Sequence, residues 1–480
     1  MTSQSAAVES RLFTCKRTDN VFAAIEKCLD NGLGACLVVS DDQSLVGRIT
    51  LDDIRCGILD GHVLTDTSLD RYIHDGVRPS PPPGGERRNE PSADDGPLTP
   101  VLDYRGHLID VVVDRSKQFV QVAKPDLSHH EFRTVLDAFI STWISSKGPY
   151  VRRLEADFAS FVGTQHGIAV TNGTVALHLA LLALGIGAGD EVIVPDLTFA
   201  ATVNAVLYCG ATPILADIDP QTWTLTVEQV QRVITPRTKA IIPVHLYGRP
   251  AEIGPLVAFA HDRGCVVVED CAEALGARYD GRTVGEFGDV SCFSFYANKI
   301  VTTGEGGICL TNSQSIAQSI AQLRDHGVTP GTSYWHERVG YNYRMTNLQA
   351  AIGCSQIWRI DGALQRNQRI ERMYRDRLAG IPGVSFPPTL PDRYEPVVWL
   401  ACAQVPAEAR ARLIEQARRA DIEMRPFFHP LSTLPAYEKY ARPCPNSLAL
   451  SRTGINLPTS TAVDNKVADK IRGLFLETLG

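Results

Sequence analysis

The sequence predicts an α/β protein with a mostly parallel seven-stranded sheet, covered by helices on both faces and followed by a small C-terminal α/β domain. From about residue 124 onward, short apolar runs alternate with segments of helical length. A segment rich in proline, glycine and charge, at 77–100, separates this region from a smaller β/α unit. The chain of 480 residues is long enough for roughly two to four domains.

The smaller unit covers residues 1–118. An amphipathic helix, two apolar strands and a second helix are predicted there in turn, at 21–31, 35–40, 45–50 and from Leu51 onward. The segment 77–100 can bury little apolar surface, so we interpret it as a flexible loop or linker.

We place a large domain at 125–364 and a small domain at 365–480, in which 407–420 has the spacing of an amphipathic helix. Seven apolar segments are the predicted strands of the large domain: 167–171, 191–194, 212–216, 240–244, 265–269, 291–295 and 307–310. In such sheets ligands collect beyond the carboxyl ends of the strands. Residues with a chemical role are therefore expected directly after the strands.

Composition excludes several classes of partner. With a net charge of −7, the chain has no polybasic surface for nucleic acid or for a membrane. Its 12 cysteines are scattered, without C-x-x-C pairs or metal-ligand spacing, which is typical of reduced thiols and predicts no metal site. The N-terminus lacks a signal-peptide pattern and no apolar run reaches membrane-spanning length, so we expect a cytoplasmic protein.

Lys299 is the first candidate for a chemical role. It lies in V-S-C-F-S-F-Y-A-N-K-I-V-T-T-G-E-G-G (290–307), between a predicted strand and a glycine-rich turn. A lysine at the end of a strand that faces a pocket is partly desolvated, which lowers its pKa and lets the neutral amine attack an aldehyde. Taken alone, such a lysine is more often a surface residue of a loop.

Five further candidate residues lie near the ends of predicted strands. Gly173 and Thr174 open a helix whose free amide groups can bind a phosphate, although the same pattern also caps helices. Asp270 ends a strand, where its carboxylate can keep a pyridine nitrogen protonated or can cap a helix. Ser294 can donate to the phosphate or bond within its strand, and Phe199 can stack on a ring or belong to the core. Together with the lysine, these residues provide what a pyridoxal phosphate site needs.

Residues from about 125 to 480 resemble the DegT-type sugar aminotransferases, which have fold type I of the pyridoxal phosphate-dependent transferases. The matching stretches include N-G-T-V-A-L-H-L-A-L, E-D-C-A-E-A-L-G-A, S-F-Y-A-N-K-I-V-T-T-G-E-G-G and G-Y-N-Y-R-M-T-N-L-Q-A-A-I-G. The resemblance implies that Lys299 binds the cofactor covalently, that Asp270 pairs with the ring nitrogen, and that the other four residues hold phosphate and ring. It also implies that Asn342 reaches the phosphate of a neighbouring subunit, so that a homodimer shares its active sites.

Two positions depart from the commonest pattern of that family. Glu273 stands near the cofactor's phenolic oxygen, where glutamine or histidine is frequent, and Tyr296 replaces a frequent histidine. The surrounding stretches are most similar to perosamine synthases, which implies amino transfer from L-glutamate to GDP-4-keto-6-deoxymannose in polysaccharide (O-antigen) biosynthesis. A UDP- or dTDP-linked 4-keto or 3-keto sugar is the alternative substrate. Arg425, in R-P-F-F-H-P, is a candidate for binding an anionic group of the substrate or forms an ordinary salt bridge.

The N-terminal unit resembles a cystathionine-β-synthase-type (CBS) module through A-C-L-V-V-S-D-D-Q-S-L-V-G-R-I-T-L-D-D-I-R (35–55). In that family the hydroxyl and the carboxylate that match Thr50 and Asp53 can hold the ribose of a nucleotide. The segment 99–114 resembles only part of a second copy, because the proline-rich stretch replaces the helical portion expected before it. We therefore favour a structural or assembly role over a sensor of adenine nucleotides.

Overall fold

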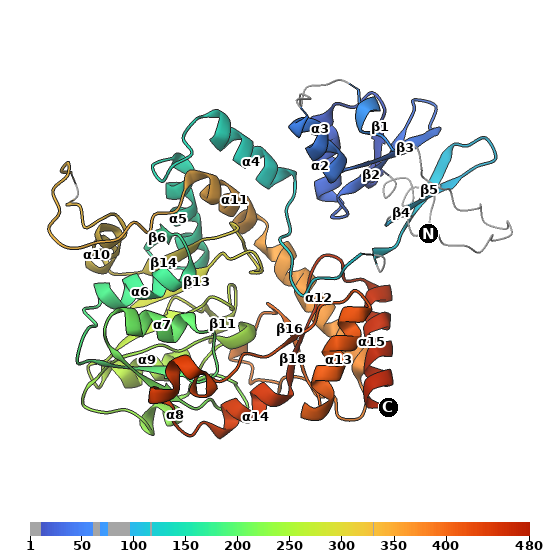
Figure 1. Cartoon of the computed structure of the whole chain (residues 1–480). Coiled ribbons are helices and arrows are strands. Elements are labelled where there is room, and N and C mark those ends of the chain that lie inside the picture. Colours follow the sequence, from blue (N-terminus) through green and yellow to red (C-terminus); the bar gives the residue numbers. More distant parts are fainter. Residues whose placement is uncertain (1–10, 61–67, 75–96, 116–117, 330) are drawn as a thin grey trace. The chain divides into compact units, whose positions relative to one another are not determined.

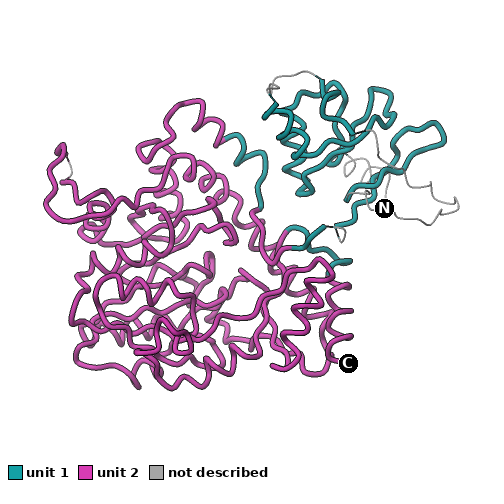
Figure 2. The backbone as a smooth tube through the Cα atoms, in the orientation of Figure 1, with its two compact units in different colours: residues 1–120, 126–133, 461–467 teal, residues 121–125, 134–460, 468–480 magenta. Residues whose placement is uncertain are grey.

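The computed structural model describes residues 11–60, 68–74, 97–115, 118–329 and 331–480. The chain forms two compact units (Figure 2). Unit 1 comprises residues 1–120, 126–133 and 461–467, and unit 2 comprises residues 121–125, 134–460 and 468–480. Among the described residues, no helix combines the length and the apolar character that crossing a membrane requires.

Unit 2 is built on a seven-stranded sheet with the order β6-β14-β13-β10-β9-β7-β8. Figure 1 labels three of its strands, β6, β14 and β13. Its strands are β6 (His166–Val170), β7 (Glu191–Pro195), β8 (Thr212–Ala216), β9 (Thr238–Ile241), β10 (Val266–Asp270), β13 (Val290–Ser294) and β14 (Gly307–Thr311). The pairs from β13 to β8 are parallel, whereas β14 is antiparallel to both of its neighbours. The predicted mostly parallel seven-stranded sheet is therefore confirmed.

One strand of the sheet, β9, begins and ends earlier in the sequence than predicted. The segment 240–244 was expected as a strand, but β9 ends at Ile241. Pro243 follows two residues later and has no amide hydrogen to give to a neighbouring strand, which accounts for the early end.

Side chains alternate between the two faces of this sheet, and each face has its own helices. Ile168, Cys292 and Cys309 belong to a core that also includes residues of α6 (Gly173–Ala183), α7 (Ala201–Tyr208) and α10 (Gln314–Arg324). The neighbouring residues Ala169, Phe293 and Ile308 belong to a second core, formed with α5 (Pro149–Val162), α11 (Asn347–Trp358) and the beginning of α12 (Ile360–Leu378). This alternation, with a period of two residues, buries both faces of the sheet.

The remaining elements of unit 2 pack against strands β7 to β10 or form the C-terminal region that we call the small domain. Near β9 and β10 lie α8 (Val227–Gln231) and α9 (Ile253–His261), and a small antiparallel sheet is formed by β11 (Arg278–Tyr279), β12 (Arg282–Thr283) and β15 (Tyr394–Glu395). The small domain has the sheet order β16-β18-β17, with β16 (Ala401–Gln404), β17 (Arg425–Pro426), β18 (Gly454–Leu457), α13 (Ala407–Arg419), α14 (Pro445–Thr453) and α15 (Asn465–Leu479). The helix predicted at 407–420 is thus present as α13.

Unit 1 contains a three-stranded sheet and a separate hairpin. The sheet consists of β1 (Thr14–Lys16), β2 (Ala35–Val39) and β3 (Leu45–Thr50), with α2 (Val21–Asp30) and α3 (Leu51–Leu59), and the hairpin of β4 (Leu98–Leu102) and β5 (Leu108–Val113). Most of the predicted linker at 77–100 lies outside the described residues. The prediction was wrong for its last three residues, because 98–100 form the beginning of β4 and pair with β5.

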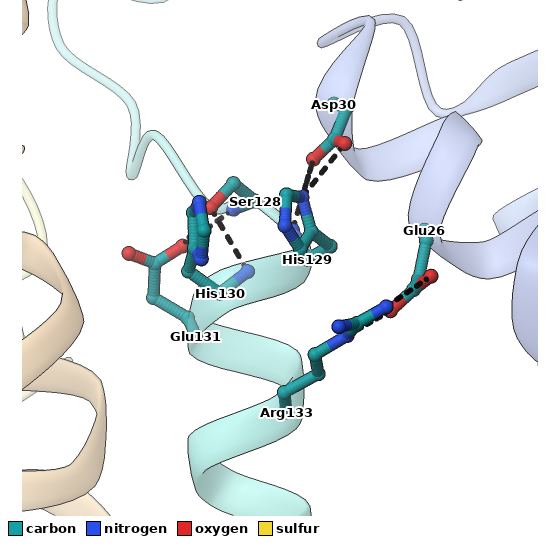
Figure 3. Close-up of polar contacts among 7 residues, drawn as sticks. All are labelled: Glu26, Asp30, Ser128, His129, His130, Glu131 and Arg133. Carbon is teal, nitrogen blue, oxygen red and sulfur yellow. Dashed lines mark hydrogen bonds and ion pairs between the residues drawn. The ribbon is translucent and has the colours of Figure 1, made fainter.

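Unit 1 also includes the first turn of α4 (His129–Ile140), whose remaining residues belong to unit 2. Figure 3 shows how this turn is bound to α2: the amide and Nδ1 of His129 contact the carboxylate of Asp30, at 3.0 Å and 2.8 Å, and Arg133 pairs with Glu26. Ser128 caps the helix together with Glu131, whose carboxylate accepts hydrogen bonds from the amide and hydroxyl of Ser128. These charged contacts fix where α4 begins.

Candidate active site

A cavity of about 720 Å³ lies in unit 2, at the carboxyl ends of the central strands. Nine of the ten predicted site residues line it: Gly173, Thr174, Phe199, Asp270, Glu273, Ser294, Tyr296, Lys299 and Arg425. They come from the ends of β6, β10 and β13, from the segment after β7 and from β17 of the small domain. These residues thus share one position, near the carboxyl ends of the strands, where ligands of such sheets bind.

Lys299 reaches this cavity from the turn after β13, in which its amide donates to the carbonyl of Tyr296 at 2.9 Å. Its Nζ lies 3.8 Å from the centre of the Trp399 ring, over the face of the indole. Burial lowers the pKa of Lys299, and the nearby carboxylates of Glu273 and Asp270 oppose this shift. The site therefore favours a neutral amine more than water does.

Asp270 is the last residue of β10 and is 5% exposed. The hydroxyl of Thr202 donates to Oδ2 at 2.8 Å, and the amide of Ala272 donates to Oδ1 at 3.2 Å. Burial raises the pKa of Asp270, while these hydrogen bonds and the charge of Lys299 oppose the rise. A carboxylate held in this way can pair with a protonated nitrogen inside the cavity.

Glu273 is buried beside this pair, with Oε2 accepting a hydrogen bond of 2.8 Å from the amide of Tyr247. Burial raises the pKa of Glu273 to about 7, and the Lys299 charge only partly opposes the rise. Tyr247 has φ 51° and ψ 28°, a left-handed conformation that costs a tyrosine energy and that aims its amide at the carboxylate. Near neutral pH, Glu273 is therefore able to donate as well as to accept a proton.

The neighbouring Glu269 points to the opposite side of β10, as alternate strand residues do. Its carboxylate accepts hydrogen bonds from the amides of Gly285, Phe287 and Gly288, and His245 Nε2 lies 3.1 Å away. Although His245, Glu269 and Cys271 lie close enough to bind a metal ion, these backbone contacts occupy the carboxylate. We assign the cluster to holding the turn at 285–288 against β10.

The N-terminus of α6 forms a cradle for an anion. The side chain of Asn172 caps the helix by accepting a hydrogen bond from the amide of Val175, which leaves the amides of Gly173 and Thr174 at the cavity. A Cβ atom on Gly173 would lie 2.9 Å from Cβ of Ser294, so only glycine lets α6 approach β13 this closely. The hydroxyls of Thr174 and Ser294 complete a set of donors suited to a phosphate.

Asn342 is the predicted residue that does not line the cavity. It is exposed, and its backbone pairs with Asp325. Sequence reasoning missed three residues of the site, namely Thr202, Tyr247 and Trp399. Their roles depend on contacts between distant parts of the chain, so no local pattern could have indicated them.

Residues 125–474, most of the chain, match the model of the DegT/DnrJ/EryC1/StrS aminotransferase family. The chain belongs to this family. Residues 6–60 match the CBS domain, so the aminotransferase carries a CBS module at its N-terminus.

Three relatives of this aminotransferase illustrate the similarity. GDP-perosamine synthase of Caulobacter vibrioides is 42% identical over 359 residues, which cover 73% of this chain and 96% of that protein. UDP-N-acetyl-3-dehydro-alpha-D-glucosamine 3-aminotransferase of Acidithiobacillus ferrooxidans is 44% identical over 231 residues, 48% of this chain and 62% of that protein. The protein Spr1654 of Streptococcus pneumoniae, solved in its PLP form, is 28% identical with a TM-score of 0.70, and the alignment covers 74% of this chain and 97% of that one.

The cofactor of this aminotransferase is pyridoxal phosphate. The cavity fits that molecule in three respects: it has a desolvated lysine, a buried carboxyl group and the free N-terminus of a helix. When bound, the cofactor supplies an electron sink for the carbon that loses a proton.

Proposed function

We propose that this aminotransferase moves the amino group of L-glutamate to a 4-keto-6-deoxy nucleotide sugar, converting GDP-4-keto-6-deoxymannose to GDP-perosamine. The observation that carries transamination is the meeting of Lys299, Asp270 and Glu273 in one cavity with an anion cradle. The choice of sugar is supported by the 42% identity to a GDP-perosamine synthase over nearly the whole length of that relative.

In this proposal Lys299 would hold the cofactor at rest. Its amine, once free and neutral, would remove the proton from Cα of the amino donor, and in the second half-reaction it would deliver a proton to the sugar carbon that receives the amino group. Asp270 keeps the ring nitrogen protonated, and Glu273 shares a proton with the phenolic oxygen of the cofactor. The phosphate is held by Gly173, Thr174 and Ser294, and Phe199 lies against the ring.

The substrate sugar would enter beside Tyr296 and Arg425. Tyr296 is 49% exposed within the lining of the cavity, where its hydroxyl is available to a sugar. Arg425 pairs with Glu423 at 2.7 Å and would exchange this partner for an anionic group of the nucleotide. Because exposed ion pairs contribute little stability, that exchange costs little.

We propose that the functional enzyme is a homodimer in which Asn342 completes the phosphate site of the partner. Asn342 is exposed and outside the cavity of its own chain. Exposed aromatic and aliphatic side chains of the same region support an interface there, namely Tyr208, Tyr334, Trp335 and Val339.

Complementation tests the shared site. Lys299→Ala and Asn342→Ala chains should each be inactive alone, whereas mixing them restores one intact site in every heterodimer. Half of the dimers are then heterodimers, so roughly a quarter of the wild-type activity is expected. If the mixture stays as inactive as its components, Asn342 does not act across an interface.

For the CBS module we propose an assembly role. Thr50 caps α3, and its hydroxyl donates to Asp53 Oδ2 at 2.6 Å, while Oδ1 of Asp53 lies 2.6 Å from His74 Nε2. The two groups that would hold a ribose are therefore already bonded within the protein. We expect calorimetric titration of the full chain with AMP, ATP and GDP-sugars to show no binding that depends on Thr50. If one of these nucleotides binds to the wild type but not to Thr50→Val, the sensor hypothesis is restored.

The amino acceptor can be identified by absorbance. L-Glutamate should bleach the band of the bound cofactor, and only a true keto-sugar should restore it. We expect restoration by GDP-4-keto-6-deoxymannose and not by UDP- or dTDP-linked 3-keto sugars. Restoration by a UDP-3-keto sugar alone would favour the alternative, which the similarity to the 3-aminotransferase supports.

A further inference from the structure

A second cavity of about 380 Å³ lies in unit 2, and its lining includes three arginines, Arg249, Arg372 and Arg375. Its other walls are mainly apolar and aromatic and include Tyr394, Leu390 and Val397. Leu400 lines both this cavity and the larger one, but none of the charged residues is shared. The proposed transamination uses no residue of this arginine group.

Arg249 is a buried cation without a carboxylate partner among the described residues. It is 6% exposed, its Nε donates to the carbonyl of Thr222 at 3.1 Å, and its Nη2 donates to the carbonyls of Gln221 and Pro388. Its guanidinium also lies 5.0 Å from the centre of the Trp223 ring. Burial lowers the pKa of Arg249 to about 10, so the side chain remains charged at neutral pH.

The other two arginines add to this charge. Arg375 donates from Nε to Glu371 at 2.6 Å, and its guanidinium lies 4.9 Å from the Phe386 ring. Arg372, on the same helix α12, is exposed and forms no ion pair with any described residue. Three arginines against the single carboxylate of Glu371 leave the charged lining of the cavity positive by two.

We propose that this cavity binds a small organic dianion, with its oxyanion group on the arginines and its carbon body against Tyr394 and Leu390. A buried positive charge is costly unless an opposite charge compensates it, and the buried guanidinium of Arg249 bonds only to carbonyl groups of the protein. Half-buried Arg375 pairs with Glu371, and exposed Arg372 adds a further positive charge. A planar guanidinium group can donate two parallel hydrogen bonds to the oxygens of a carboxylate or of a phosphate. A cavity of about 380 Å³ has the size of a small-molecule site.

Two classes of small molecule carry such oxyanion groups on a carbon body, namely phosphate esters and dicarboxylates. Isothermal calorimetry on the holoenzyme with inorganic phosphate and with succinate distinguishes them. Stronger binding of phosphate assigns the site to phosphate esters, and stronger binding of succinate assigns it to dicarboxylates. Using the holoenzyme keeps the cofactor cradle filled during both titrations.

Arg372→Gln is the decisive variant, because Arg372 is exposed and its loss removes no described contact. Arg249→Gln is unsuitable, because it would also remove the bonds to three carbonyl groups. We expect at least tenfold weaker binding in Arg372→Gln, about the effect of one lost charged hydrogen bond. The matched control is Arg472→Gln, which removes an exposed arginine of α15 outside the cavity and should bind like the wild type.

Two results would overturn the proposal: no saturable binding of either anion up to about 10 mM, or equal affinities in the wild type and in Arg372→Gln. If succinate bound at the proposed amino-donor site instead, its affinity would be the same in the wild type and in Arg372→Gln. The test is therefore independent of the proposed transamination.

Discussion

The Glu273→Gln substitution should make the enzyme's stability less dependent on pH. Glu273 is 5% exposed, and burial raises its pKa to about 7 from an ordinary value of 4.5. A carboxyl group whose pKa is raised on folding stabilises the protein below its unfolded pKa, and this contribution is lost as the pH rises through the folded pKa. Glutamine has a similar shape and does not titrate.

The magnitude follows from the two pKa values. For a single group that shifts from 4.5 to about 7, linkage predicts that the stabilisation falls by about 2.5 kcal/mol between about pH 5 and about pH 8. Other titrating groups are common to both proteins and cancel in the difference. We therefore compare the free energies of unfolding of the wild type and of Glu273→Gln. The wild-type value minus the variant value should decrease by about 2.5 kcal/mol between about pH 5 and about pH 8.

Urea unfolding of the two apoenzymes at several pH values, at equal protein concentration and ionic strength, measures this difference. Removing the cofactor ensures that its binding does not contribute. A difference that stays constant to within about 0.5 kcal/mol over this range would show that Glu273 is not a buried titrating carboxyl group.

Three other substitutions test the site and the N-terminal module. Gly173→Ala should weaken binding of the cofactor, because the new Cβ would lie 2.9 Å from Ser294 Cβ. The absorbance of the cofactor that remains bound after dialysis measures this, and full retention would contradict a phosphate site at Gly173. Trp399→Leu should lower the pKa of Lys299 further, since a desolvated ammonium over an indole face gains about 2 kcal/mol. The pH dependence of Lys299 acylation in the apoenzyme measures this, and an unchanged profile would refute it. Thr50→Ala should destabilise α3 by about 1 kcal/mol, measured by hydrogen exchange, and unchanged protection would mean that the capping box is unimportant.

The main sheet, and the position of Lys299 at the cavity, could be predicted from the sequence because each depends on short stretches of chain. A buried parallel strand is a short apolar run, and the residue after it lies at the edge where ligands bind. Asp270 is the last residue of such a run, and Lys299 lies in the turn that follows another. Local sequence therefore determined both their positions and their proximity.

The residues that modulate this pair could not be predicted in this way. Trp399 comes from the polypeptide that leads into the small domain, about a hundred residues after the lysine whose Nζ it contacts. Thr202 bonds to Asp270 across 68 positions of sequence. Such contacts depend on how whole elements pack, and neither periodicity nor capping patterns contain that information.

Unit 1 is composed of three separate stretches of chain, 1–120, 126–133 and 461–467. Domains that are exchanged between proteins during evolution are usually continuous, with both ends in exposed linkers. If the chain were cut after residue 120, His129 and Arg133 would lose their partners Asp30 and Glu26. The segment 461–467 would also be separated from the rest of unit 1. Unit 1, which contains the CBS match at 6–60, is therefore discontinuous in sequence. To transfer this unit intact to another enzyme, the first turn of α4 and the segment 461–467 have to be included.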